Sequence, residues 1–547
     1  MQDGATRHRA RALTELLVSW PSVTGTADEA SFPSKLAEFL GATPYFQNHP
    51  DDIVIAPIPG DPLGRSNLLA LVKGGGRRTV LLTGHFDVVP EDNYGDLAGL
   101  ARAPDALRAG LVERLERTGA HPQALADLRS GRFVPGRGAL DMKSGLAAGL
   151  CALEAFAAEP LIGNILFVTT PDEEDRSVGM RAAADMLPAF LQERGLDPVL
   201  AINLDAICDE GTGETGRIVA MGCLGKLLLS AMVVGKEAHA AYPFAGVNAA
   251  YLAAELITEI ECAPALAELS GPELAAPPTV LGAKDGKTLY NVTTPGDTWL
   301  FWNVLVHRRR AAEVLAIARQ SAEVAITRGS TRMQERAGAI GQTLTAADAW
   351  SRATVLSFVE LFDRARQTDP AFEGMFRTEA ERLANDAALD LPERSRRLTR
   401  LAWEVSGLEG PAVVLGFASM TYPAIPWAGE AGVEQAIREA VETTSADLDS
   451  SIRMQNYYPA IADMSFLGPV DQDDLRQAAA NTPVWGSSIP WNLDRPPTPG
   501  IPVINIGPWG RDYHHALERA DADYAFRVLP QLLSNVVRNV LAASVEP

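Results

Sequence analysis

LLTGHFDVVP, residues 81–90, decides how the chain is interpreted, because two polar side chains stand at the end of an apolar run. Leu81 and Leu82 predict a buried strand, and His85 and Asp87 follow where that strand would end. Residues i and i+2 of a strand point to the same face, so the imidazole and the carboxylate would project together. Burying one polar group without a partner costs about 2–7 kcal/mol. A hydrogen-bonded core histidine is one explanation, and either way the partners must come from elsewhere in the chain.

Other apolar runs predict further strands, and helical patterns lie between some of them. Strands are expected at 68–72, 79–84, 164–170 and 200–205, and helices at 8–20, 32–41, 143–158 and 177–194. Strands interleaved with helices are typical of an α/β fold, in which active groups gather at the carboxyl ends of strands. His85, Glu173 and Asp205 fall at such ends.

The pattern changes after about residue 217 and indicates a second, smaller α+β domain. Strands are expected there at 227–235, 299–307 and 411–423, and helices at 246–261 and 311–327, with a helix-rich, charged stretch at 347–408. A helix at 432–443, a strand at 501–507 and a helix at 523–541 end the chain. We therefore predict one domain formed by 1–217 and 429–547, with a domain of 218–428 inserted in it.

The composition limits the function classes. The chain has 547 residues, 47% of them hydrophobic and 21% charged, which is ordinary for a globular protein of more than one domain. A net charge of −21 argues against nucleic acid and against anionic membranes as partners. The four cysteines include no CxxC pair, and neither a signal peptide nor a long apolar window is found. These features predict a cytoplasmic protein that binds neither nucleic acid nor a membrane.

Two further polar clusters follow the first. GRGALDMKSG (136–145) places Asp141 between a glycine-rich turn and a predicted helix, where an aspartate commonly caps the helix. TTPDEEDRSVG (169–179) carries the four successive acids 172–175, as a solvated loop often does. These acids directly follow an apolar strand, however, and like charges this close repel unless a cation neutralises them or one binds a proton. A metal ion together with a general base would resolve that conflict.

Two more clusters lie later in the chain. LAINLDAICDE (200–210) ends a strand with Asp205, which also fits a turn or a cap. RDYHHALERA (511–520) holds His514 and His515, and in regular structure at most one of two adjacent side chains points into a given site. Four of the five clusters fall at strand ends or strand-to-helix turns, which favours one shared site.

In this order, HFD, GRGALDMKSG, DEE, the strand-end Asp205 and a late His514 followed four residues on by Glu518 resemble the M20 family of metallopeptidases and aminoacylases. The resemblance covers 1–217 and 429–547, and GKEAHAAYPFAGVNAA is similar to the family's lid-domain motif. The length, the large lid and the ending GPWGRDYHHALER look most like the RocB-type branch, named for arginine utilisation. The family implies a zinc-peptidase-like catalytic domain, with a central mixed sheet flanked by helices, and an inserted α+β lid and dimerisation domain.

The resemblance also implies a centre of two divalent metal ions, usually zinc, although the ligand types suit manganese and cobalt as well. The implied ligands are His85 and Asp205 for one ion, Glu174 and His514 for the other, and Asp141 between them. Glu173 would be the general base, and Asp87 would orient His85. Two such ions about 3.5–4 Å apart can share a water and polarise a carbonyl. The base would then pass the proton of the water to the leaving nitrogen.

Three more residues are candidates for contacts with the substrate. The resemblance implies that His239 of the lid stabilises the oxyanion, often across a dimer interface, whereas KEAHAAYP alone predicts a surface histidine. Asn291 resembles a lid asparagine that contacts the substrate or the oxyanion. Arg453 is a candidate for binding a substrate carboxylate, with a surface arginine as the alternative. Residues 330–410 exceed the usual lid and match no part of it.

These features predict a metal-dependent hydrolase that cleaves the amide bond of a peptide or an N-acyl amino acid through a metal-activated water. Its substrate would be a short peptide or another small amide, and the lid domain would allow a homodimer. One alternative is hydrolysis of a ureido or carbamoyl C–N bond in an arginine-derived compound. Another is a non-catalytic binding protein on the same fold.

Overall fold

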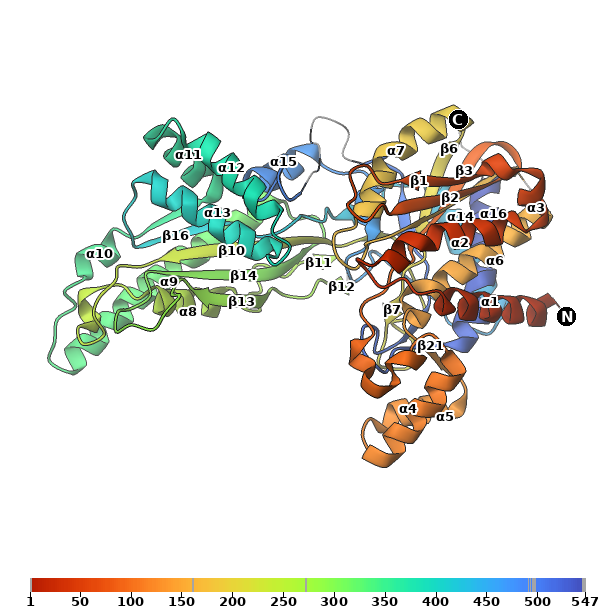
Figure 1. Ribbon diagram of the computed structural model, residues 1–547, viewed down its shortest axis with the longest axis horizontal. Helices are drawn as coiled ribbons and strands as arrows, with labels where there is room; N and C mark the ends of the chain where they lie inside the picture. Colours follow the sequence, from red (N-terminus) through yellow and green to blue (C-terminus); the bar gives the residue numbers. More distant parts are fainter. Residues whose placement is uncertain are drawn as a thin grey trace. The chain divides into compact units, whose positions relative to one another are not determined.

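The computed structural model describes residues 2–159, 162–270, 273–489, 491, 493 and 498–543 (Figure 1). The chain forms two compact units, each with its own sheet and core. Unit 1 comprises Met1–Cys223, Ile425–Pro469 and Thr498–Pro547, and unit 2 comprises Leu224–Ala424 and Val470–Pro497.

Unit 1 contains an eight-stranded mixed sheet in the order β1-β2-β5-β3-β6-β19-β8-β18. Its strands are β1 (Ile53–Pro57), β2 (Ser66–Lys73), β5 (Ile162–Thr170), β3 (Gly75–His85), β6 (Asp197–Asn203), β19 (Val503–Asn505), β8 (Ile218–Ala220) and β18 (Arg453–Gln455). The four central strands β5, β3, β6 and β19 run parallel. Their carboxyl ends therefore meet at one edge of the sheet, where such folds place their sites.

Helices pack on both faces of this sheet. Those that pack on it or share its core are α1 (Gln2–Ser19), α2 (Ala27–Gly41), α6 (Ser144–Ala158), α7 (Val178–Arg194), α14 (Ala431–Asp447) and α16 (Leu529–Ala542). Helix α3 (Pro44–Asn48) packs on α2, and α4 (Pro104–Thr118) and α5 (Pro122–Ser130) pack on each other in a separate small core. Alternate strand residues, such as Val80 and Leu82 of β3, share a core with α1, α2, α6, α14 and α16. Helix α7 contacts β2, β5 and β6. The predicted α/β fold with a central mixed sheet between helices is thus confirmed.

A second, four-stranded sheet of unit 1 joins segments that are far apart in the sequence. It consists of β4 (Phe133–Pro135), β21 (Arg519–Asp521), β20 (Trp509–Arg511) and β7 (Ile207–Cys208), in that order. Strands β20 and β21 pair antiparallel, β7 pairs parallel with β20, and β4 pairs with β21. The turns next to these short strands carry Asp141, Asp205 and His514, so this sheet brings three candidate ligands to one place.

Unit 2 is built on a five-stranded sheet in the order β13-β14-β10-β16-β15. Its strands are β13 (Thr279–Asp285), β14 (Asp297–Val306), β10 (Gly225–Val234), β16 (Ala412–Phe417) and β15 (Thr354–Ser357), and its longer helices are α8 (Ala249–Ile260), α9 (Ala311–Ala339), α11 (Phe358–Thr368), α12 (Phe372–Ala384), α13 (Leu391–Ser406) and α15 (Gln472–Ala480). Other short helices and strands among the described residues are α10 (Ala347–Ser351), β9 (Gly222–Cys223), β11 (Leu269–Ser270), β12 (Glu273–Leu274) and β17 (Ile425–Pro426).

Most of the unassigned stretch 330–410, namely α11, α12 and α13, forms a second helical layer of unit 2, while its first part joins the core of α8 and α9. Alternate residues of β10 face opposite cores: Leu229 packs with α8 and α9, whereas Met232 packs with α11, α12 and α13. Strand β15, which the sequence patterns did not predict, extends the sheet by pairing parallel with β16. Both faces of the sheet are therefore covered by helices of the same chain.

The first unit breaks at Cys223 and resumes at Ile425, close to the predicted 217 and 429, and the main difference from the predicted domains lies later in the chain. The predicted second catalytic part, 429–547, includes Val470–Pro497, but this segment belongs to the compact unit 2. The reason is local packing, because Ala478 of α15 joins the core of α8 and α9, and Asp474 accepts a hydrogen bond from the Ala311 amide at 2.7 Å.

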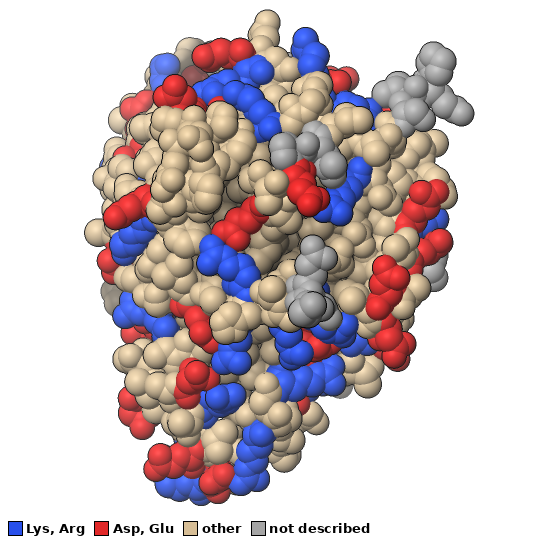
Figure 2. All heavy atoms as spheres, turned by 90° about the vertical axis from the view of Figure 1, so that its right-hand side faces the viewer, with Lys and Arg blue, Asp and Glu red and all other residues tan. Residues whose placement is uncertain are grey.

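Charge is spread over the surface rather than gathered. On the face that Figure 2 displays, acidic and basic side chains are interspersed, so the net charge of −21 forms no continuous acidic patch there. None of the helices among the described residues has the length and apolar character needed to cross a membrane.

Candidate metal centre

Five of the predicted side chains converge within unit 1. His85 Nε2 lies 3.2 Å from Asp141 Oδ1 and 3.7 Å from Asp205 Oδ1. His514 Nε2 lies 3.0 Å from Asp141 Oδ2 and 3.1 Å from Glu174 Oε2. Within each of these two groups, the atoms that could hold a metal ion all lie within 4.8 Å of one another. Asp141 belongs to both groups and offers one carboxylate oxygen to each.

The backbone explains why these side chains meet. His85 ends β3 and pairs with Thr170, the last residue of β5, directly before the turn that carries Glu174. Asp205 follows β6, and its carbonyl group packs so closely on Gly507 that a Cβ there would lie 1.9 Å from the carbonyl oxygen. Asp141 lies in an irregular turn that ends before α6, whose N-cap residue is Lys143. The interpretation of Asp141 as a helix cap is therefore wrong, and its carboxylate faces the two histidines instead.

Asp87 contacts both sides of the cluster. His85 Nδ1 lies 3.0 Å from the Asp87 carbonyl oxygen, nearer than the 3.5 Å to its carboxylate. The carboxylate accepts hydrogen bonds from the amides of Glu173 and Glu174, at 3.1 and 3.3 Å, and from the Thr24 hydroxyl at 2.9 Å. Asp87 thus contacts His85 through its backbone carbonyl group and the acidic turn through its side chain, and its predicted role in orienting His85 stays a prediction. With Nδ1 donating to the carbonyl group, Nε2 of His85 is left to accept a cation.

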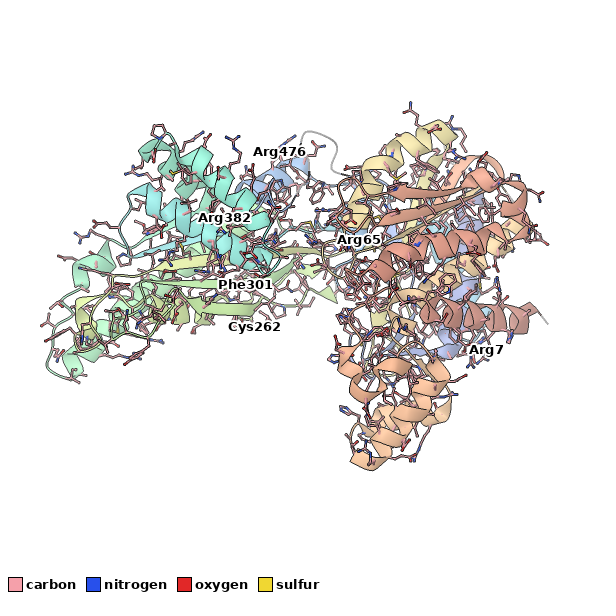
Figure 3. The ribbon with its side chains drawn as sticks, in the orientation of Figure 1. Arg7, Arg65, Cys262, Phe301, Arg382 and Arg476 are labelled. Atoms are coloured by element: carbon pink, nitrogen blue, oxygen red, sulfur yellow. The ribbon has the colours of Figure 1, made fainter. Side chains whose placement is uncertain are left out.

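The acidic run 172–175 is not uniformly solvated. Asp172 is buried and pairs with Arg65, which is labelled in Figure 3, while Asp175 is exposed and pairs with Arg176. Arg65 also pairs with Glu29 at 3.3 Å, so this buried cation anchors the start of the turn. Nothing in the sequence around Arg65, which directly precedes β2, indicated this role, because the contact joins residues 107 positions apart.

Two more buried acids support the cluster and were missed as functional residues. Glu518, which the sequence indicated only through its spacing from His514, accepts hydrogen bonds from the amides of Leu140 and Asp141 at 3.2 and 3.3 Å. Asp463 accepts a hydrogen bond from the Thr170 hydroxyl at 3.1 Å, where β5 enters the acidic turn. Burial raises the pKa of Asp463 to about 7. The spacing of Glu518 from His514 could have identified Glu518 from the sequence, whereas no sequence pattern indicated Asp463.

The carboxylates of the cluster repel one another. Burial raises the pKa of Glu173 well above its ordinary value; His85 opposes this rise, and the charges of Asp205 and Glu174 add to it. Burial likewise raises the pKa of Glu174 and of Asp205, and the charge of Asp141 adds to both shifts. The group therefore favours a state in which positive charge, as protons or cations, lies among these acids.

The same acids raise the pKa values of the two histidines. Burial lowers the pKa of His514, but hydrogen bonds to Asp141 and Glu174 outweigh it and raise the pKa to about 10. For His85 too, burial is outweighed by hydrogen bonds to Asp141 and Asp205, and its pKa lies well above the ordinary value. Protons on these imidazoles thus provide the positive charge that metal ions would provide.

The residues present fit a pair of divalent cations. Glu174 Oε1 is buried and, within the described part of the chain, accepts no hydrogen bond, as expected of an oxygen reserved for a cation. Two imidazoles with carboxylates, one of them shared, form a donor set that suits zinc. Glu173 belongs to neither ligand group, and its role as general base stays a prediction.

The predicted lid residues lie in unit 2. His239 is exposed and forms an isolated β-bridge with Thr293. Asn291 is also exposed, and its Oδ1 accepts hydrogen bonds from the amide and the hydroxyl of Thr293, at 3.2 and 2.6 Å. His239 and Asn291 therefore belong to neighbouring loops, and their roles stay predictions.

Arg453 and His515 lie in unit 1. Arg453 is exposed on β18 and donates to the Glu214 carbonyl group at 2.8 Å and to Gln455 Oε1 at 3.0 Å. Its role in substrate binding stays a prediction. Of the two adjacent histidines, His514 faces the cluster, and His515 is absent from both ligand groups.

The chain matches the model of Peptidase family M20/M25/M40 over residues 81–473. It belongs to this family. Two relatives from Bacillus subtilis (strain 168) are similar to it along nearly their whole length. The uncharacterized protein YqjN is 30% identical over 98% of this chain and 97% of its own, and Protein RocB is 30% identical over 97% and 95%. A succinyl-diaminopimelate desuccinylase of Methylobacterium nodulans is 32% identical over 49% of this chain and 55% of its own length.

Solved structures share the fold of this M20 protein. A tripeptidase from Staphylococcus aureus matches with a TM-score of 0.51 and 16% identity over 98% of both chains. An M20 family metallo-carboxypeptidase from Sulfolobus solfataricus matches with a TM-score of 0.52 and 11% identity over 97% of this chain and 99% of its own. The predicted family, its RocB-like character and the enzyme class, a metal-dependent hydrolase of amide bonds, are confirmed.

Proposed function

We propose that this enzyme is a dizinc hydrolase of small amides, acting on an N-acyl amino acid or a short peptide. The observation that carries the proposal is the position of Asp141 between two ligand groups, with Glu173 in neither. The proposed ligands are His85 and Asp205 for one ion, Glu174 and His514 for the other, and Asp141 for both. Manganese or cobalt at the same residues would serve the same chemistry.

The chain's own residues divide the reaction between them. Zinc held by the ligands supplies a Lewis acid and lowers the pKa of a water at the site. Glu173 takes a proton from this water while the oxygen of the water forms the new bond to the amide carbon. When the C–N bond breaks, Glu173 delivers the proton to the leaving nitrogen, and the products are a carboxylate and an amine. The Asp87 carboxylate holds the Glu173 amide during both transfers.

Further parts of the proposal rest on the family resemblance. His239 would stabilise the oxyanion, and Asn291 and Arg453 would contact the substrate. Because the family's lid histidine often acts across a dimer interface, the proposal includes a homodimer formed through unit 2. Measuring the mass of the protein in solution tests whether it is a dimer. A cytoplasmic location agrees with four cysteines that are all free.

The names of the relatives guide the choice of substrate. A desuccinylase acts on a succinylated amine and a tripeptidase on a peptide, so N-acyl amino acids and short peptides are the classes to test first. The RocB-type resemblance adds arginine and its derivatives as the amino-acid part.

A comparison of substrates tests the proposal. The zinc-loaded enzyme is offered N-acyl amino acids, dipeptides and N-carbamoyl amino acids at equal concentrations, and Glu173→Gln serves as the impaired control. We expect turnover of an N-acyl amino acid or a dipeptide by the native enzyme, and turnover lower by roughly 10²–10⁴-fold in the variant. Hydrolysis of the carbamoyl set alone would contradict the substrate class and favour a ureido-type hydrolase.

A further inference from the structure

Asn93 connects two loops that carry candidate ligands. It lies in the 3-10 segment Asp92–Leu100, which follows the LLTGHFDVVP stretch in the sequence but belongs to none of the motifs that indicated the function. Its Nδ2 donates to the His514 carbonyl group at 2.9 Å, and its Oδ1 accepts from Arg137 Nη2 at 2.8 Å. One amide group thus contacts the backbone of one ligand and a buried arginine at the same time.

The connection continues to the shared ligand. Arg137 Nη1 donates to Glu518 Oε2 at 2.6 Å, and both side chains are 1% exposed. Oε1 of the same glutamate accepts from the Asp141 amide at 3.3 Å. Hydrogen bonds therefore run from the His514 carbonyl group through Asn93, Arg137 and Glu518 to the backbone of Asp141. Their ends are two ligands of the same proposed ion.

The backbone of His514 needs such support. Its φ is 64°, in the left-handed region, which is unfavourable for a residue other than glycine and persists only where the surroundings hold it. Its side chain is 43% exposed, so packing contributes little to its position. His85, by contrast, is 2% exposed at the end of a central strand. The backbone of His85 is held by its pairing with Thr170 in the sheet, whereas the carbonyl group of His514 is held by the side chain of Asn93 from another loop.

We infer that Asn93 is a positioning residue for the His514 half of the centre. By holding the His514 carbonyl group against the Arg137–Glu518 pair, it keeps His514 and Asp141 at the separation that binds one ion between them. The inference rests on the proposed two-metal function and adds to it a residue that selectively sets the affinity of one half. Partners of metal ligands commonly matter by 10–100-fold in affinity.

Two substitutions separate the two bonds of Asn93. Asn93→Ala removes both bonds, whereas Asn93→Asp keeps the acceptor for Arg137 and loses the donor to His514. If the bond to the His514 carbonyl group is the one that matters, both variants lose affinity alike. Asn48→Ala is a matched control, because Asn48 is also exposed in unit 1 and donates to a backbone carbonyl group at 2.9 Å, within α3.

The measurement is a zinc titration of the metal-free full-length chain against a competing chelator, with the thermal midpoint of the metal-free protein recorded beside it. We expect two binding events in the native enzyme. We assign the weaker event to the half that contains His514. In Asn93→Ala and Asn93→Asp this event should lose about 10–100-fold in affinity. The tighter event and the thermal midpoint of the metal-free protein should stay as in Asn48→Ala.

Other outcomes overturn the inference. Unchanged binding in both Asn93 variants, or equal weakening of both events, contradicts a role in one half. Full affinity in Asn93→Asp would move the role to the Arg137 contact and contradict it as well. A native enzyme that binds a single ion contradicts the two-metal centre itself, which is a failure of the proposed function and is recognised before any variant is measured.

Discussion

The two halves of the candidate centre use the same ligand chemistry on different backbone supports. His85 and Asp205 follow adjacent strands of the central sheet, and their side chains are 2% and 8% exposed. His514 lies in a turn between two three-residue strands, is 43% exposed, and meets Glu174 from another turn. The first half is therefore organised by the sheet and the second by side-chain hydrogen bonds. We expect the first half to bind its ion tightly and the second to exchange its ion.

Asp141 is the one ligand whose loss should affect both halves, so its substitution is expected to have the largest effect. In Asp141→Asn the bridging charge disappears, and the zinc content should fall from about two ions per chain to less than one. Activity should fall below detection. Elemental analysis after dialysis measures the metal content, with the exposed Asp175→Asn as the matched control. Retention of two ions would show that Asp141 is not shared.

Glu173 belongs to neither half of the centre. Glu173→Gln should lower kcat by roughly 10²–10⁴-fold, the usual contribution of a general base, while both ions stay bound. The hydrogen bond from the backbone amide of Glu173 to Asp87 does not involve the Glu173 side chain, so the acidic turn should keep its position. If the zinc content collapses together with kcat, the roles of Glu173 and Glu174 are exchanged.

Removing one histidine at a time tests the comparison directly. His514→Ala should keep one tightly bound ion, because His85, Asp141 and Asp205 remain. His85→Ala should lose tight binding, since Asp141 then contributes only to the exposed half. Zinc retained after dialysis against a weak chelator distinguishes the two, with the neighbouring His515→Ala as the unaffected control. The comparison is wrong if both histidine variants retain the same amount of zinc.

The same contrast separates what the sequence predicts from what it does not. His85 and Asp205 were predictable because apolar periodicity identifies strand ends, and side chains there project from a known edge. His514 was identified through the family spacing to Glu518, since no periodic pattern surrounds it. Asn93 was missed because its two bonds reach residues 421 and 44 positions away. Contacts of that kind depend on tertiary packing, and a single sequence carries no periodic signal for them.

The second layer of unit 2 was missed for a related reason. Thr354–Ser357 is a short strand inside a stretch that is otherwise helical, and four residues are too few for a period to be recognised. The sequence predicted only a helix-rich, charged stretch at 347–408, without bounds for single helices. Their position on the sheet became visible only through the shared core with Met232.

The effect of pH on zinc affinity is the smallest of these expected changes. It is expected for the half that contains His514. His514 must lose its proton before it binds a cation. In the metal-free site burial lowers its pKa, but hydrogen bonds to Asp141 and Glu174 outweigh this and raise it to about 10. At neutral pH the proton is therefore bound, and zinc must displace it.

Because one displaced proton corresponds to about tenfold in affinity per pH unit, the weaker binding event should lose up to about tenfold for each unit between about pH 8 and pH 6. Above a pH of about 10 this dependence should vanish, since His514 is then already neutral. Calorimetric titrations in two buffers of different ionisation enthalpy count the protons released per ion. A weaker event that releases no proton would mean that His514 is not its ligand, and the exposed half would have to be held by carboxylates alone.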